Sequence, residues 1–160
     1  MSSQQPPQAP PGAPPPAASV PPAQMLIENI MISAVHSINA DMTVRDAVHE
    51  LLKYKIGGAP VIDSQKKVLT VVSEGDLLRL AAAMGLEKSI FQCMLKLTKT
   101  DKLITVLKTD TFAEAYKKFL SHSVHRLIVV DEKGRLEGLV SRSTVLRVLA
   151  DAAPAAKNHV

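Results

Sequence analysis

The sequence predicts a mixed α/β (α+β) protein in which a β-α-β-β-α unit occurs twice and the two copies pack sheet to sheet. The chain aligns with itself at an offset of 68 residues, which pairs Val35–Ala82 with Leu103–Ala150 without a gap and makes ten pairs identical. The spacing of apolar residues also repeats between the copies. One copy has only about 50 residues and three short strands, too few to bury a stable core alone.

Each copy is expected to begin with a short strand, at Val35–Ile38 and Leu103–Leu107, followed by an amphipathic helix. Apolar residues at i, i+3, i+4, i+7 and i+8 predict one buried stripe on each helix. Both helices open with a capping box, Thr43 with Asp46 and Thr111 with Glu114. The stripes are Val44, Ala47, Val48, Leu51 and Leu52 in the first copy, and Phe112, Ala115, Tyr116, Phe119 and Leu120 in the second.

A hairpin and a second helix complete each copy. Short apolar runs ending in aspartate, then polar turn residues and a second apolar run, predict two buried strands joined by a turn. A helix should then begin at Ser73 and again at Ser141. Between the copies, the apolar residues of Leu86–Leu97 predict a connecting helix. The paired strands are Ala59–Asp63 with Val68–Val72 and Leu127–Asp131 with Leu136–Val140.

Composition divides the chain further. Residues 1–24 carry no charge and hold nine of the eleven prolines, so a disordered or extended arm is expected there. The first copy is assigned to residues 25–84, a linker with the connecting helix to 85–102, the second copy to 103–153, and a tail to 154–160.

The arm lacks the pattern of a secretory signal or a transit peptide. No apolar run reaches the ~18–20 residues of a membrane span. A single cysteine, Cys93, suits a reducing compartment, and we expect the cytoplasm.

Several function classes find little support. The net charge of +4 is modest, and the chain has two tyrosines, three phenylalanines and no tryptophan, so DNA or RNA binding is not expected. His122 and His125 are spaced like a metal pair but lack further ligands nearby, so no metal site is expected. No phosphate-binding glycine loop or nucleophile motif occurs. The sequence therefore favours a regulatory module over an enzyme.

The repeated motifs resemble the CBS domain (the cystathionine-β-synthase type). They are Ala59-Pro60-Val61-Ile62-Asp63 and Val72–Leu78 in the first copy, and Val124–Asp131 and Gly138–Ser141 in the second. The resemblance implies a tandem pair, or Bateman module, with pseudo-two-fold symmetry and two clefts between the repeats. It implies no obligatory cofactor, but adenosine ligands such as AMP, ADP, ATP or S-adenosylmethionine. It also implies a homodimer that regulates an enzyme, a channel or a transporter.

The resemblance places the better cleft at Ser73 and Asp76, whose carboxylate would hold the ribose hydroxyls, together with Gly58, Ala59 and Pro60. His125 and Arg126 would bind a phosphate there, since the planar guanidinium matches two phosphate oxygens. Two alternatives stay open. Ser73-x-x-Asp76 is also an ordinary capping box, and His125-Arg126 is equally compatible with a solvated pair at a strand edge.

The second cleft is expected around Leu127, Ser141 and Thr144. Thr144 stands where the first copy has Asp76, and a hydroxyl cannot accept from two ribose hydroxyls as a carboxylate can. This cleft is therefore expected either to be degenerate or to bind something else. Two functions remain: a sensor that binds an adenosine ligand, and a ligand-free dimeric scaffold.

Overall fold

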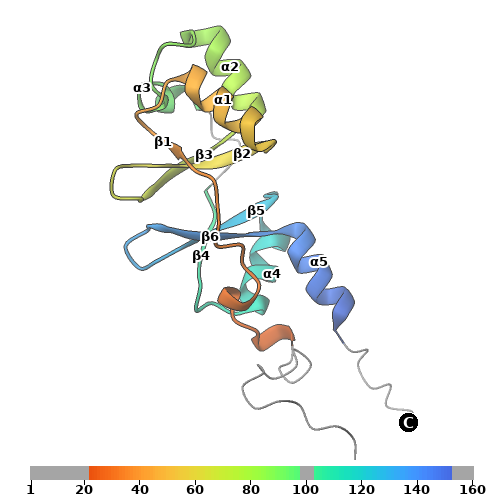
Figure 1. Ribbon diagram of the computed structural model, residues 1–160. Coiled ribbons are helices and arrows are strands. Elements are labelled where there is room, and N and C mark those ends of the chain that lie inside the picture. Colours follow the sequence, from red (N-terminus) through yellow and green to blue (C-terminus); the bar gives the residue numbers. More distant parts are fainter. Residues whose placement is uncertain (1–21, 98–102, 153–160) are drawn as a thin grey trace, which may run out of the picture.

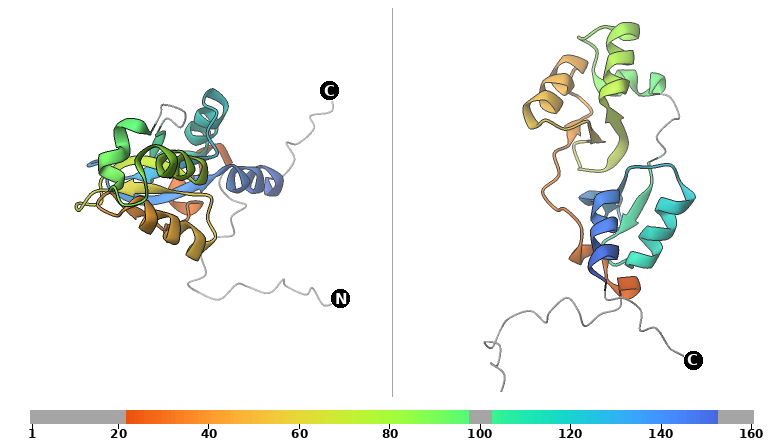
Figure 2. Two further views of the ribbon diagram at one scale, coloured as in Figure 1. Left: turned by 90° about the horizontal axis from the view of Figure 1, so that it is seen from above. Right: turned by 90° about the vertical axis from the view of Figure 1, so that its right-hand side faces the viewer.

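The structure, a computed structural model, describes residues 22–97 and 103–152. It consists of two lobes stacked end to end, each with a three-stranded sheet and covering helices (Figure 1). The two sheets face each other at the centre, and the helices lie on the outer sides (Figures 1 and 2). This arrangement confirms the predicted tandem α/β fold.

The two repeats share one topology. The first contains β1 (Ile38–Asn39), α1 (Val44–Tyr54), β2 (Gly58–Ile62), β3 (Val68–Ser73) and α2 (Glu74–Met84). The second contains β4 (Thr105–Leu107), α4 (Phe112–Ser121), β5 (Arg126–Val130), β6 (Leu136–Ser141) and α5 (Arg142–Asp151). In each sheet the middle strand pairs in parallel with the first strand and antiparallel with the third. The first strands, β1 and β4, are shorter than the sequence predicts.

The predicted helix starts are confirmed by their hydrogen bonds. Thr43 before α1 and Thr111 before α4 each accept from the backbone N–H three residues on, and the acidic residue there accepts from the cap's own N–H. Ser73 forms the same reciprocal box with Asp76 at the start of α2. These caps satisfy backbone donors that the first turn of a helix leaves free.

The repeats are joined through the tips of their hairpins. Val68 N–H donates to Gly134 O over 3.0 Å, and Leu136 N–H donates to Lys66 O over 2.9 Å. These two bonds are related by the offset of 68 residues, so they follow the pseudo-two-fold symmetry. Beside them, Val68, Ile128 and Val130 form an apolar cluster between the sheets. The opposite ends of the sheets are where the candidate site lies.

The segment Met25–Ile32, which we call the strap, comes before the first repeat's strands in sequence but packs on the second repeat. It crosses to the second repeat, where the side chain of Ile27 is fully buried in the core. Figure 1 shows it beside α4 and β6. Ile27 N–H donates to Asp110 O, and Ile32 exchanges two backbone hydrogen bonds with Leu139. The expected boundary at residue 25 therefore gives the start of the first repeat in sequence only. The buried core of that repeat begins at Ile38.

Two other segments differ from expectation. Pro22–Gln24, assigned to the arm, form a short 3-10 helix, while residues 1–21 and the tail from 153 lie outside the described residues. The connecting helix predicted over Leu86–Leu97 is short: α3 spans Ile90–Cys93 and continues as a 3-10 turn, Met94–Lys96. A cap at Ser89 starts it late, and Ile90 and Cys93 are buried in the first repeat's core. Residues 98–102 of the predicted linker are outside the described residues.

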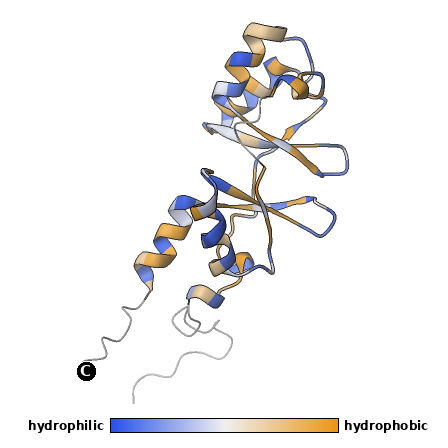
Figure 3. Cartoon of the chain, turned by 180° about the vertical axis from the view of Figure 1, so that it is seen from behind, coloured by the Kyte–Doolittle hydropathy of each residue, from blue (hydrophilic) through white to orange (hydrophobic). Residues whose placement is uncertain are grey.

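The apolar helix stripes are only partly buried. In α1 and α4 the last leucine of each stripe, Leu52 and its equivalent Leu120, is 68% and 72% exposed. In α2 and α5, Leu78 and its equivalent Leu146 are 74% and 65% exposed. Figure 3 shows apolar segments along these outer helices. Both repeats therefore present the same pair of leucines to the outside.

Candidate functional site

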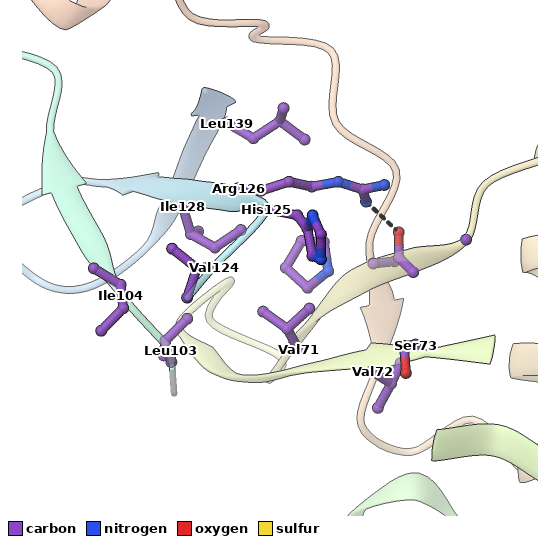
Figure 4. Close-up of a pocket in the computed structure, with 14 residues that line it drawn as sticks. Val71, Val72, Ser73, Leu103, Ile104, Val124, His125, Arg126, Ile128 and Leu139 are labelled. Atoms are coloured by element: carbon purple, nitrogen blue, oxygen red, sulfur yellow. Dashed lines mark hydrogen bonds between the residues drawn. The ribbon is translucent and has the colours of Figure 1, made fainter. Parts of the chain in front are cut away.

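A cavity of about 200 Å³ lies between the two repeats, at the end of the sheets away from the hairpin tips. Most of its wall is aliphatic (Figure 4). The first repeat contributes the start of β2 with the residue before it and the end of β3. The second contributes the two residues before β4, the two residues before β5, two residues of β5 and one residue of β6. The lining residues are Gly57, Gly58, Ala59, Pro60, Val71, Val72, Ser73, Leu103, Ile104, Val124, His125, Arg126, Ile128 and Leu139.

Arg126 is the main polar group at this cavity. It opens β5, and its Nη1 donates across the cavity to the carbonyl of Gly58 over 3.0 Å (Figure 4). Gly58 is the residue equivalent to Arg126 in the first repeat, so this bond lies where the two strand starts meet. A guanidinium has five N–H donors. Within the described residues this bond is the only hydrogen bond of the Arg126 side chain, which leaves further donors for an anion.

His125 lines the cavity beside Arg126, as the sequence analysis expected of this pair. Its side chain is exposed, and Figure 4 shows the ring at the level of the Arg126 side chain. An imidazole there can donate to an anion at the cavity mouth when a ring N–H points to it. The structure thus brings His125 and Arg126 together with Gly58, Ala59, Pro60 and Ser73.

Gly58 has a steric reason to be glycine. A Cβ at this position would lie 2.7 Å from the backbone oxygen of Val72 and 3.3 Å from the Cα of Ser73. Both neighbours belong to the paired strand β3, so they cannot move aside as a side chain could. At the adjacent Gly57, a Cβ would meet only Glu74 Oε2, at 3.8 Å.

We therefore predict that Gly58→Ala lowers the free energy of unfolding by about 1–2 kcal/mol, the usual cost of overpacking a tight site. Gly57→Ala is the matched control and should change the stability by less than about 0.5 kcal/mol. Chemical denaturation of both variants measures the difference. Equal stabilities would show that the β2–β3 contact relaxes freely.

Asp76 is held by its own helix rather than by the cavity wall. Its Oδ2 accepts from Ser73 N–H and Ser73 Oγ–H, at 2.8 and 2.7 Å, and its Oδ1 accepts from Arg79 Nη2 at 2.6 Å. The residue is 5% exposed and is not among the lining residues, whereas Ser73 is. The capping interpretation is confirmed by this geometry. A contact between Asp76 and ribose stays a prediction.

The bonds to Asp76 also set its ionisation. Burial by itself raises the pKa of the Asp76 carboxyl, but the Ser73 bonds and the Arg79 ion pair outweigh it and hold the pKa below the usual value. A depressed native pKa means that the ionised group stabilises the fold at neutral pH. That contribution is lost as the pH falls through the native pKa.

The residues assigned to the second cleft do not line the cavity between the repeats. Leu127 is fully buried in the core of the second repeat. Ser141 caps α5 by accepting from Thr144 N–H, and its Oγ lies 3.0 Å from Thr144 Oγ1 and 2.7 Å from Ser143 Oγ. A cluster of hydroxyls therefore replaces the ion pair found at Asp76, and no carboxylate stands at this helix start.

Sequence reasoning missed most of the apolar wall. Val71, Leu103, Ile104, Val124, Ile128 and Leu139 were identified only as residues of predicted strands or of a repeated motif. Their alternation along the strands was the available signal, because every second residue of a strand points to the same face of the sheet.

In the described part of the chain, no group of three His, Cys, Asp or Glu side chains could hold a metal ion. Among the described helices, none is both long and apolar enough to cross a membrane.

The profile of the CBS domain matches residues 27–83 and 97–151. Among curated proteins, the chain is 28% identical to an inosine-5'-monophosphate dehydrogenase of Aquifex aeolicus over 120 residues, which make up 75% of this chain and 24% of the enzyme. It is 25% identical to a 17.7 kDa protein of Acidianus ambivalens over 125 residues, 78% of this chain and 73% of the relative. The chain thus spans only about a quarter of the dehydrogenase.

Solved structures share the fold. The crystal structure of CBSX2 in complex with AMP is 27% identical with a TM-score of 0.65, covering 79% of this chain and 96% of that one; CBSX2 is a CBS-pair protein from Arabidopsis thaliana. MJ1004 from Methanocaldococcus jannaschii is 26% identical with a TM-score of 0.67, over 79% and 60% of the two chains. A CBS domain pair/ACT domain protein from Thermotoga maritima is 26% identical with a TM-score of 0.65, over 81% and 100%.

Proposed function

The chain belongs to the CBS domain family, as a pair of CBS repeats, and we propose that it is a regulatory sensor that binds an adenosine nucleotide, AMP in the first place, between these repeats. Binding would alter how the repeats present themselves to a partner protein, such as an enzyme, a channel or a transporter. We propose no catalytic role, because the cavity wall is aliphatic and its polar groups suit binding.

The observation that carries this proposal is Arg126, which reaches from the second repeat over an apolar cavity to the first. An aliphatic cavity suits the faces of a purine ring, and a guanidinium at its mouth suits a phosphate. The similar CBSX2 structure contains AMP. Retention of these two features in one cleft favours a sensor over a ligand-free scaffold.

The size of the cavity favours the smallest of the expected ligands. Its volume of about 200 Å³ lies below the roughly 300–1,000 Å³ of typical small-molecule sites. A compact adenosine ligand therefore fits this cavity better than a larger one. AMP is accordingly favoured over ADP, ATP and S-adenosylmethionine.

A thermal-shift panel of AMP, ADP, ATP, S-adenosylmethionine and NAD tests the function directly. A ligand at ~100 times its dissociation constant should stabilise the native protein by about 2.7 kcal/mol. We expect the largest shift with AMP. If none of the five shifts the melting temperature at millimolar concentration, the scaffold function replaces the sensor function.

We also propose that the protein forms a homodimer through its outer helices. The exposed leucines Leu52 and Leu78 of the first repeat recur as Leu120 and Leu146 in the second, so both ends of the molecule offer the same apolar surface. A two-fold symmetric dimer buries one patch on both subunits at once. The pseudo-symmetry of the chain supports such an assembly, since each repeat offers an equivalent pair of helices.

Replacing Leu78 and Leu146 together by glutamate is therefore expected to give a monomer. Light scattering should report twice the 17.2 kDa chain mass for the unmodified protein and the single mass for the variant. The control is Leu95→Glu, because Leu95 is almost fully exposed but lies outside the four-leucine set. A monomeric unmodified protein, or a variant that stays dimeric, would contradict this interface.

A further inference from the structure

A second cavity, of about 360 Å³, lies on the second repeat and shares no lining residue with the cavity between the repeats. It is formed where the parallel strands β4 and β5 both end, beside the turn that joins β5 to β6. The carboxyl ends of parallel strands are a common place for ligand sites in α/β sheets. The charged residues that line the cavity are Lys108, Asp131, Glu132, Lys133, Arg135 and Glu137.

Glu137 reaches this cavity from a β-bulge. Val129 pairs with Gly138, whereas the next residue of β5 pairs with Leu136, so Glu137 is the extra residue of β6. Its Oε1 accepts from Lys108 Nζ over 3.0 Å. Its Oε2 is buried and has no hydrogen-bond partner among the described residues. A buried acceptor without a donor costs free energy, so this oxygen needs a donor from elsewhere.

The first repeat has aliphatic residues where the second has this ion pair. At the offset of 68 residues, Glu137 corresponds to Leu69 and Lys108 to Ala40. Ala40 is buried in the core of the first repeat, and Leu69 packs against that core. The same fold therefore forms without charges at these two positions. This difference between the copies favours a binding role for the charged pair over a structural one.

Arg135 supplies unused donors to the same cavity. Its Nε donates to Asp131 Oδ2 over 2.6 Å, and this is the only hydrogen bond of its guanidinium within the described residues. Both Nη groups are left for an anion, and the planar guanidinium matches the two oxygens of a carboxylate. Lys133 adds an exposed cation to the lining. The lining as a whole carries three cations and three carboxylates, so both signs are present without a net charge.

These groups fit a small zwitterion. A nucleotide would face three carboxylates here, and a metal ion would face three cations, whereas a zwitterion pairs with both signs. The unpartnered Oε2 needs an N–H donor, which a primary ammonium has and a quaternary ammonium lacks. The terminal torsion of a glutamate is broad, so this oxygen can turn towards the cavity. Leu107 and Val130 add an aliphatic wall. The cavity volume lies near the lower end of the roughly 300–1,000 Å³ of small-molecule sites.

We propose that this cavity is a second ligand site, which binds a free α-amino acid with a small aliphatic side chain. The ammonium of the amino acid donates to Glu137, and its carboxylate accepts from Arg135. The site is separate from the nucleotide cavity and does not depend on the proposed function. Gly134, next to Arg135, accepts the hydrogen bond from Val68 that joins the hairpin tips. A ligand in this cavity therefore lies beside the joint between the repeats.

The experiment measures binding of L-alanine, L-valine and L-leucine to the full chain by thermal shift and calorimetry. At least one of them should raise the melting temperature at millimolar concentration. The N-acetyl derivative of that amino acid lacks the ammonium, and its amide lacks the carboxylate. Neither derivative should bind, because each has lost one of the two charges that the cavity pairs with.

Variants of the cavity locate the binding. Glu137→Gln keeps the size of the side chain but removes its charge, and should weaken binding about tenfold, the scale of one hydrogen bond to a charged group. The double variant Lys108→Ala with Glu137→Leu introduces the residues of the first repeat, so it should fold and bind no amino acid. Glu87→Gln is the matched control, because Glu87 is also paired with a cation but lies in the first repeat. It should bind as tightly as the unmodified protein, and circular dichroism checks that each variant is folded.

The outcomes separate this site from the nucleotide cavity. Arg126→Met alters the cavity between the repeats and should leave amino-acid binding unchanged. If Arg126→Met loses that binding, the amino acid occupies the nucleotide cavity and the second site is overturned. The second site is also overturned if none of the three amino acids binds, if the N-acetyl and amide forms bind equally well, or if both Glu137 variants bind as the unmodified protein does. Nucleotide sensing stands in each of these cases, and a failure of AMP to bind leaves the amino-acid site intact.

Discussion

A chain that begins at Ser33 is expected to lose the structure of its second repeat, whereas a chain that begins at Met25 should fold as the full chain does. The strap residues absent from the shorter chain supply a fully buried side chain, Ile27, to the second core. They also supply the backbone partners of Asp110, Phe112 and Leu139. Thermal melting followed by circular dichroism should show one full transition for the Met25 chain and a reduced one for the Ser33 chain.

A point substitution makes the same test within the full chain. Ile27→Ala should lower the free energy of unfolding by about 2–5 kcal/mol, the range for deleting a buried aliphatic side chain that leaves a cavity. Glu28→Ala, at the adjacent exposed residue, is the control and should stay within about 0.5 kcal/mol. If Ile27→Ala matches its control, the strap is a peripheral attachment and the Met25 and Ser33 chains should melt alike.

The strap shows what local patterns cannot predict, namely which repeat a segment packs on. Local patterns predicted α1 and α4 correctly, since a capping box and a 3.6-residue stripe act within a few residues of each other. Which repeat a segment packs on is decided by contacts about 80–110 residues away along the chain, and apolar spacing carries no such information. One residue in the sequence does reflect the packing of the strap on the second repeat. Gly138 stands where the first repeat has Thr70, and a Cβ at Gly138 would lie 2.7 Å from the Ile32 carbonyl oxygen.

The same division between local and distant information applies to the site. The Ser73–Asp76 capping box can be predicted from four consecutive residues, and it is present in the structure. The ion pair of Arg79 with Asp76 is also local, since the two residues are three apart in α2. The Arg126 bond to Gly58 joins residues 68 apart. The internal repeat makes these two positions equivalent. The cationic side chain of the second repeat therefore meets the backbone carbonyl of the first near the pseudo-two-fold axis.

Replacing Arg126 by methionine is expected to abolish most of the AMP affinity. Methionine keeps the unbranched apolar stem of the side chain while removing the charge and every donor, so the loss reports the contribution of the guanidinium. A bond to a charged group is worth about 1.5–3 kcal/mol, so the dissociation constant should rise roughly 10- to 150-fold. Calorimetry on folded protein measures it.

Two comparisons determine what the loss means. Thr144→Ala, at the start of α5 outside the cavity lining, should leave the AMP affinity within about twofold of the unmodified protein. Arg126→Lys keeps the charge but not the planar fork, and should bind AMP with intermediate affinity. Because Arg126 also bonds to the Gly58 carbonyl, the unfolding free energy of each variant is measured in parallel, and a small decrease without ligand is expected. If Arg126→Met binds AMP as tightly as the unmodified protein does, the phosphate does not contact Arg126, and the nucleotide occupies the cavity in another orientation or lies elsewhere on the chain.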